Sequence, residues 1–208
     1  MNESTIKEIL DTAPSYNKLD IPSRGIYDSA SFTLFSKKID KEIEYRMIFS
    51  RLPWNMEIVD EFLSINHLKI SKNAVDTLLV FLDESEALLL FFAFDALVDG
   101  KRVTFLTGTG NVGTVFSNVS SYMSEIVKKN NDVPLAILFS GKEEGRQKLY
   151  QTFYDNCSKF VPGLLPIQEI APDPKNSISM ELGKEWVVGN ERFRTLRKNA
   201  QMAVGKAG

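Results

Sequence analysis

Residues 101–130 read KRVTFLTGTGNVGTVFSNVSSYMSEIVKKN, and this stretch decides the fold prediction. Residues 103–107 are predicted to form a strand, and apolar residues at helical spacing predict a helix over residues 112–129. Three glycines lie at the junction of these two elements: Gly108 and Gly110 between them, and Gly113 in the first turn of the helix. A glycine loop that opens a helix after a strand can hold a phosphate, because the helix N-terminus offers unpaired N–H groups and glycine lets the backbone approach closely.

The segments around this unit follow from hydrophobic periodicity and turn residues. Upstream we predict a helix at 2–12, a loop at 13–30, strands at 31–37 and 42–50, a helix at 53–70, and buried strands at 77–83 and 87–98. Asp99–Gly100 is a tight-turn signal. Downstream we predict a strand at 135–139, a helix at 143–160, a proline-rich connection at 161–174, a hairpin of 177–182 and 185–188 around Gly183, and a helix at 190–204 capped by Asn190.

This order predicts an α+β fold in which helices flank a mixed, mostly antiparallel central sheet. Strands 103–107 and 135–139 should lie near each other, splayed or parallel, joined by the helix at 112–129. The domain division is an N-terminal helix and extended arm (1–30), an α/β domain (31–189) and a basic C-terminal helix or tail (190–208). We expect the tail to be an interaction element that can be removed without unfolding the domain.

Composition bounds the classes of function. The chain has 208 residues, 43% of them apolar, a net charge of −2, one Cys and one His. Cys157 cannot form an internal disulfide, and a zinc site would depend mostly on carboxylates, so no metal is predicted. The polar start predicts no signal peptide, and the apolar run at 87–96 is too short to span a bilayer. We therefore expect a cytoplasmic protein with no membrane partner.

The order of strands, glycine loop and helices, ending in a helix that carries Leu149-Tyr150, resembles the GNAT acetyltransferase superfamily over residues 43–160. In that family the loop binds the pyrophosphate of acetyl-CoA through backbone N–H groups. The resemblance implies that Gly108, Gly110, Asn111 and Gly113 bind the cofactor. It also implies that Tyr150 protonates the departing CoA thiolate.

The chain departs from the family pattern at three places. Phe105 stands where Gln or Arg is usual, Glu143 where Asn is common, and Tyr154-Asp155 where Gly-Phe is common. An amine-acetylating enzyme also needs a base. The candidates are Asp95, Glu86 and His67, of which Asp95 is the most unusual because it interrupts an apolar strand.

The chain also resembles small, largely uncharacterised proteins of tailed phages. The shared segments are Leu-Thr-Gly-Thr-Gly at 106–110, Val-Phe-Ser at 115–117, and the stretch from Ser140 to Tyr150. Some internal virion proteins of phages reuse a GNAT-like fold without evident catalysis. The resemblance implies a location in the host cytoplasm or in the virion.

Two classes of function are carried forward. The favoured one is a non-catalytic protein of assembly or interaction, a virion component without a cofactor, whose partners are other proteins or further copies of the chain. The alternative is an acetyl-CoA-dependent N-acetyltransferase that uses Tyr150 and Asp95. A third hypothesis, a nucleotide-binding module, has weaker support, since no Lys-Ser/Thr pair follows the glycines. Nucleic acid could be contacted only through the basic tail, which carries Arg192, Arg194, Arg197, Lys198 and Lys206.

Overall fold

The computed structural model describes residues 3–11, 14–21, 25–52, 87–103, 111–175 and 177–206. The helices in these ranges are α1 (Glu3–Leu10), α4 (Val112–Lys129), α5 (Glu144–Asp155), α6 (Cys157–Phe160), α7 (Ser177–Leu182) and α8 (Glu191–Lys206). The strands are β1 (Asn17–Lys18), β2 (Ile26–Ser36), β3 (Lys41–Arg51), β4 (Leu88–Val98), β5 (Lys101–Val103), β6 (Leu135–Gly141), β7 (Leu165–Ile170) and β8 (Lys184–Gly189).

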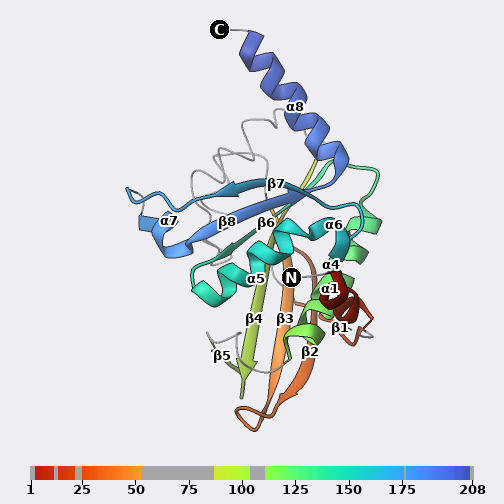
Figure 1. Cartoon of the computed structure of the whole chain (residues 1–208), viewed down its shortest axis with the longest axis vertical. Coiled ribbons are helices and arrows are strands. Elements are labelled where there is room, and N and C mark those ends of the chain that lie inside the picture. The colour runs from red at the N-terminus through yellow and green to blue at the C-terminus, as the bar shows by residue number, and fades with distance from the viewer. Residues whose placement is uncertain are drawn as a thin grey trace.

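All the described strands belong to one sheet, in the order β1-β2-β3-β4-β6-β8-β7, with β5 paired to β4 (Figure 1). Every pairing is antiparallel except that between β4 and β6. Helices pack against this sheet, so the predicted α+β class, with a mixed and mostly antiparallel sheet, is confirmed. None of the helices in the described part of the chain is long and apolar enough to cross a membrane.

The two faces of the sheet carry two separate apolar cores. The larger core receives side chains from α1, α4, α5 and α6, which lie together on one face (Figure 1). The smaller core, on the other face, includes Phe193 and the partly buried Leu196 of α8. Beyond these residues α8 extends away from the rest of the fold. The first turns of α8 therefore belong to the core, and only its distal part has the character expected of a separable tail.

Strand β4 contributes to both cores, as its continuous apolar run predicts. Leu88, Leu90, Phe92 and Phe94 belong to the larger core. The alternate residues Leu89 and Phe91 belong to the smaller core. Successive side chains of a strand point to opposite faces, so a strand covered on both faces must be apolar at nearly every position.

Several element predictions are wrong. Among the described residues the parallel neighbour of β6 is β4, through Leu88–Phe91. Val103 belongs to β5, which pairs with β4, and residues 104–107 of the predicted strand lie outside the described residues. Strand β2 begins at Ile26 inside the predicted loop, β7 lies inside the predicted connection, and residues 177–182 form helix α7 instead of a strand. The predicted helix at 143–160 is divided at Asn156 into α5 and α6. The predicted helix at 53–70 and strand at 77–83 lie outside the described residues.

Candidate functional site

The start of helix α4 is where the resemblance places the cofactor. Asn111 precedes the helix, and its side-chain amide donates a hydrogen bond of 3.0 Å to the carbonyl oxygen of Phe35, at the end of β2. A Cβ atom on Gly113 would lie 3.8 Å from the side chain of Ile9 in α1. Asn111 thus ties α4 to β2, and Gly113 faces α1. Gly108 and Gly110 lie outside the described residues.

Tyr150, the predicted acid, lies in the larger core. It is 9% exposed, and its ring makes edge contacts with the rings of Phe139 at 5.3 Å and Trp186 at 5.8 Å between centroids. Burial, with a smaller contribution from the negative charge of Asp95, raises the pKa of Tyr150 to about 12. The phenol is therefore protonated at neutral pH, and its ring is a packing element of the core.

Asp95, the predicted base, belongs to the other face of the sheet. Alternation along β4 places it with Leu89 and Phe91, opposite the face that holds Phe92 and Phe94. It forms an ion pair of 2.6 Å with Arg102. Alternation therefore places Asp95 and Tyr150 on opposite faces of the sheet, although the negative charge of Asp95 still contributes to the raised pKa of Tyr150. The other candidate bases, Glu86 and His67, lie outside the described residues.

A small cavity lies between the sheet and helices α4 and α5. Its volume is about 30 Å³, which is room for one or two water molecules. Every lining side chain is apolar or aromatic: Phe92, Phe94, Val115, Phe116, Val119, Met123, Phe139, Leu149, Tyr150 and Phe153. Among the described residues, aromatic and aliphatic side chains thus occupy most of the space beside Tyr150.

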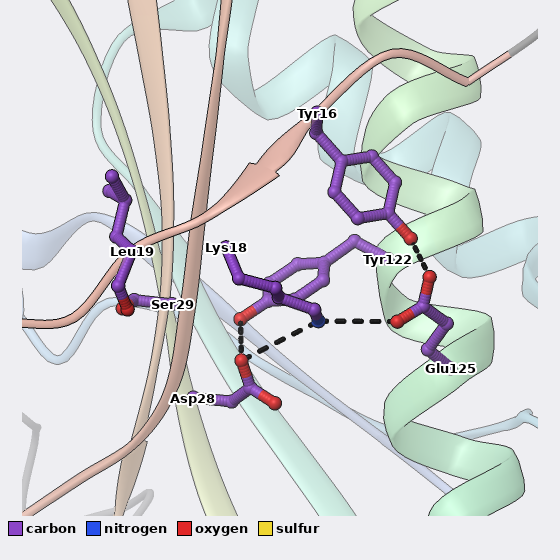
Figure 2. Close-up of polar contacts among 7 residues, drawn as sticks. All are labelled: Tyr16, Lys18, Leu19, Asp28, Ser29, Tyr122 and Glu125. Carbon is purple, nitrogen blue, oxygen red and sulfur yellow. Dashed lines mark hydrogen bonds and ion pairs between the residues drawn. The ribbon is translucent and has the colours of Figure 1, made fainter.

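A connected group of polar side chains that the sequence did not predict lies between the arm and helix α4 (Figure 2). We name it the arm–helix cluster; it consists of Tyr16, Lys18, Asp28, Tyr122 and Glu125. The Lys18 ammonium lies 3.5 Å from Asp28 Oδ1 and 3.2 Å from Glu125 Oε2. It also lies 4.2 Å from the ring centroid of Tyr122. The cluster joins the arm at β1 to strand β2 and helix α4.

The two tyrosines of the cluster donate to the two carboxylates. The Tyr122 hydroxyl donates to Asp28 over 3.0 Å, and the Tyr16 hydroxyl donates to Glu125. Burial raises the pKa of both phenols, and the neighbouring carboxylates raise it further. The hydrogen bond from Tyr16, followed by the contacts with Lys18, lowers the pKa of Glu125. The two phenols thus act as donors at neutral pH, and the Glu125 carboxylate is ionised.

Lys18 supplies the positive charge that a bound cation would otherwise supply between Asp28 and Glu125. The cluster therefore fastens the arm to α4. Two further contacts act with it: the backbone N–H of Ser15 donates to Asn118 over 2.5 Å, and Ser29 Oγ donates to the Leu19 carbonyl oxygen over 2.7 Å. Two sequence signals correspond to this arrangement: Tyr122 and Glu125 have the helical i, i+3 spacing, and Tyr16 and Lys18 alternate as in a strand. Both patterns are too common in proteins to identify the cluster.

Tyr16→Phe is expected to destabilise the protein by about 1 kcal/mol at pH 7, because it removes a hydrogen bond to a half-exposed carboxylate. The lowered pKa of Glu125 gives stability that is present above pH 4.5, its ordinary value, and is lost as the pH falls through the folded-state pKa. The difference between wild type and variant should therefore shrink at acid pH. Urea denaturation at neutral and acid pH measures it.

Tyr27→Phe is the matched control. The Tyr27 hydroxyl donates to the neutral amide oxygen of Asn130 over 2.8 Å. Removal of this hydroxyl should therefore lower the free energy of unfolding by the same amount at both pH values. If Tyr16→Phe were as insensitive to pH as Tyr27→Phe, the ionised Glu125 would not be what the Tyr16 hydroxyl stabilises.

No group of three or more metal-ligating side chains with a suitable arrangement occurs among the residues that the structure describes. Comparison of the chain with protein-family models, with curated proteins and with solved structures gives no match.

Proposed function

We propose that this protein acts in assembly or interaction with other proteins and is not a catalyst. The observation that carries the proposal is the position of Tyr150. The only phenol that the GNAT resemblance assigns to catalysis is 9% exposed and packed between Phe139 and Trp186. A proton donor to a departing thiolate must reach the reacting atoms, and a ring held in this way faces other core side chains.

Two further features support a non-catalytic role. Aromatic and aliphatic side chains occupy the space between the sheet, α4 and α5, where a cavity of about 30 Å³ remains. The start of α4 is occupied on two sides, by the Asn111 bond to β2 and by Ile9 of α1 near Gly113. Residues that could have lined a cofactor cleft therefore hold the fold together.

The place of action in this proposal is a virion or its assembly in a host cell. Its support is the sequence resemblance to tailed-phage proteins. Residues 115–117 of that resemblance lie in α4, where Val115, Phe116 and Ser117 are all buried. The segment from Ser140 to Tyr150 runs from the end of β6 into α5. The shared residues in the described part of the chain thus belong to the regular elements of the fold, which suits relatedness of fold more than a shared reaction; residues 106–110 lie outside that part.

The alternative, an acetyl-CoA-dependent N-acetyltransferase, is favoured by one observation. Antiparallel strands β2, β3 and β4 are followed by helix α4, a strand β6 parallel to β4, and a helix that carries Leu149-Tyr150. This is the order on which the resemblance rests. A rearrangement that moved Tyr150 out of the core would be needed before the enzyme could work.

Acetyl-CoA binding separates the two functions. A ligand at a hundred times its Kd adds about 2.7 kcal/mol of stability, which raises the Tm of a chain of this size by about 5–10 °C. We expect millimolar acetyl-CoA to leave the Tm unchanged, as ATP should, the control for general polyphosphate binding. A Tm increase with acetyl-CoA and not with ATP would falsify the proposal.

Tyr150→Phe gives an independent test of the same proposal. The variant keeps the ring between Phe139 and Trp186, so its stability should change by less than about 1 kcal/mol. Association with partner proteins should be unchanged as well. If the variant stayed folded but abolished an acetyl-CoA-dependent activity of the wild type, Tyr150 would be catalytic and the alternative function would be correct.

A further inference from the structure

A hollow with basic walls lies between strand β7 and helix α8. Its volume is about 340 Å³, and we call it the α8 basic hollow. It is lined by Pro166 and Ile167 of β7 and by Arg194, Arg197, Lys198 and Gln201 of α8. The four α8 residues follow the i, i+3, i+4, i+7 pattern of one helix face. The hollow therefore combines an apolar side from the strand with a cationic side from the helix.

The helix that forms the cationic side is held firmly at its base. The Asn190 side-chain oxygen accepts hydrogen bonds from the backbone N–H of Phe193 at 3.0 Å and of Leu135 at 3.1 Å. The Asn190 side-chain amide donates to the Val133 carbonyl oxygen over 2.7 Å. Phe193 is 1% exposed. The helix that presents the basic face is thus fastened to the sheet at its first turn.

The neighbouring strand cannot accept another strand at this point. Strand β7 ends the sheet within the described part of the chain, and edges of this kind invite strand addition. Here Pro166 has no N–H, and the pairing with β8 is irregular at Ile167. Arg197 donates to the carbonyl oxygen of Ile167 over 3.2 Å and also to the Gln168 side chain. A partner must therefore be recognised by its side chains.

The charges on the helix indicate the chemistry of that partner. Helix α8 carries five cationic residues and one acidic residue, in a chain whose net charge is −2. Arg194 pairs with Glu191, with N–O distances of 2.6 Å and 2.8 Å to its two oxygens. The exposed Lys198 forms no ion pair with any described residue. The hollow thus has cationic charge available on the side that faces solvent.

We propose that the α8 basic hollow binds a protein segment that carries clustered carboxylates beside an apolar side chain. The carboxylates would meet Lys198, beside the Arg194–Glu191 ion pair, and the apolar side chain would lie against Pro166 and Ile167. This inference rests on the proposed function, for which it names a contact surface. Nucleic acid fits less well, because the net negative charge of the chain repels it and an apolar wall contributes nothing to phosphate binding.

Fluorescence polarisation with three labelled probes tests the proposal on the full chain. The probes are a short glutamate-rich peptide with a central leucine, the same peptide with serine in place of the leucine, and duplex DNA of the same length. We expect sub-millimolar binding of the leucine peptide that weakens with salt, weaker binding of the serine peptide, and weaker binding still of DNA. Tighter binding of DNA, or equal binding of the two peptides, would overturn the assignment.

Charge reversal on one helix supplies the variants. Lys198→Glu, at an exposed position, should weaken the binding of the leucine peptide about tenfold or more. The new carboxylate would repel the carboxylates of the peptide. Arg194→Glu should act in the same direction. Arg192→Glu is the matched control, since Arg192 lies about 200° from Arg194 around the helix. An equal loss of peptide binding in Arg192→Glu would show that the peptide is attracted by the general charge of the helix, and the assignment of the site would be wrong.

Light scattering of the wild type and of Lys198→Glu completes the test. If the wild type forms oligomers that Lys198→Glu separates, the occupant is a second copy of the chain and the assignment to a foreign acidic segment is wrong. Failure of the peptide to bind, together with no Tm change in acetyl-CoA, would remove this inference and leave the non-catalytic function standing. A Tm increase in acetyl-CoA would remove the function itself, whatever the peptide does.

Discussion

Phe139→Ala is expected to lower the free energy of unfolding by about 3–5 kcal/mol, the usual range when a large aromatic core residue is removed. Phe139 is 2% exposed and lies on β6 at the middle of the aromatic core. Its ring stacks on Trp186 at 5.8 Å and makes edge contacts with Tyr150 at 5.3 Å and Phe153 at 5.8 Å. Its removal therefore leaves a cavity bounded by rings from α5 and β8.

The cavity cannot close easily, because its neighbours are held by other contacts. Trp186 is fully buried, and its indole N–H donates to Gln151 Oε1 over 3.1 Å. The same oxygen accepts a hydrogen bond of 2.6 Å from Lys184. Movement of the Trp186 ring into the space of Phe139 would break the first of these bonds. We therefore expect the loss to fall in the upper part of the stated range.

Urea denaturation of the wild type and Phe139→Ala measures the loss. Phe35→Ala is the control, since Phe35 is 53% exposed at the end of β2 and an exposed side chain usually changes stability by about 0.5 kcal/mol or less. If Phe139→Ala cost less than 1.5 kcal/mol, on the order of a single methylene change, the rings around Phe139 would not form the packed core described here.

Gly183→Ala is expected to have the second largest effect, a loss of about 3 kcal/mol or more. Gly183 has φ +76°, and a Cβ atom there would lie 2.6 Å from the Gly141 carbonyl oxygen and 2.7 Å from Lys142 Cα. Both are backbone atoms and cannot rotate away. The positive φ costs a non-glycine residue about 1 kcal/mol or more, and relief of the clash requires β8 to shift from the end of β6.

Gly100→Ala separates the two causes. Gly100 has φ +75°, and apart from its chain neighbours no described atom lies within 4 Å of the position of a Cβ there. This variant should therefore show the conformational cost alone, about 1 kcal/mol. The difference between the two variants, measured in the same denaturation series, gives the cost of the clash. Equal losses in the two variants would mean that the backbone around Gly141 yields, contrary to the close packing of β6 and β8.

The role of Gly183 also shows where sequence reasoning failed. A glycine between two short apolar segments is typical of a hairpin turn. It is equally typical of the end of a helix that a strand follows, so the glycine does not separate the two structures. Here the N–H of Gly183 donates to the Ser179 carbonyl oxygen over 3.0 Å and ends α7, and β8 pairs with β6 and β7 instead. Six residues are too few for periodicity to separate a helix from a strand.

The elements that the sequence predicted well are those whose burial repeats over many residues. Helix α4 has the predicted bounds, because its apolar residues follow the helical period for 18 residues. Strand β4 agrees within one residue, because a continuous apolar run suits a strand covered on both faces. Asn190 caps α8 as predicted. In each case the deciding pattern of residues lies within one short stretch of the chain, so the local sequence carries the information.

The contacts that decide function lie between distant positions, and only the folded chain establishes them. Tyr16 and Glu125 are 109 residues apart, yet they meet in the arm–helix cluster. Tyr150 and Asp95 looked like an acid and a base, but one lies in the larger core and the other on the opposite face of the sheet. No local pattern states which strands pair or which face of a helix is covered. Those choices depend on the joint burial of all the apolar faces, which is a property of the whole sheet and its helices.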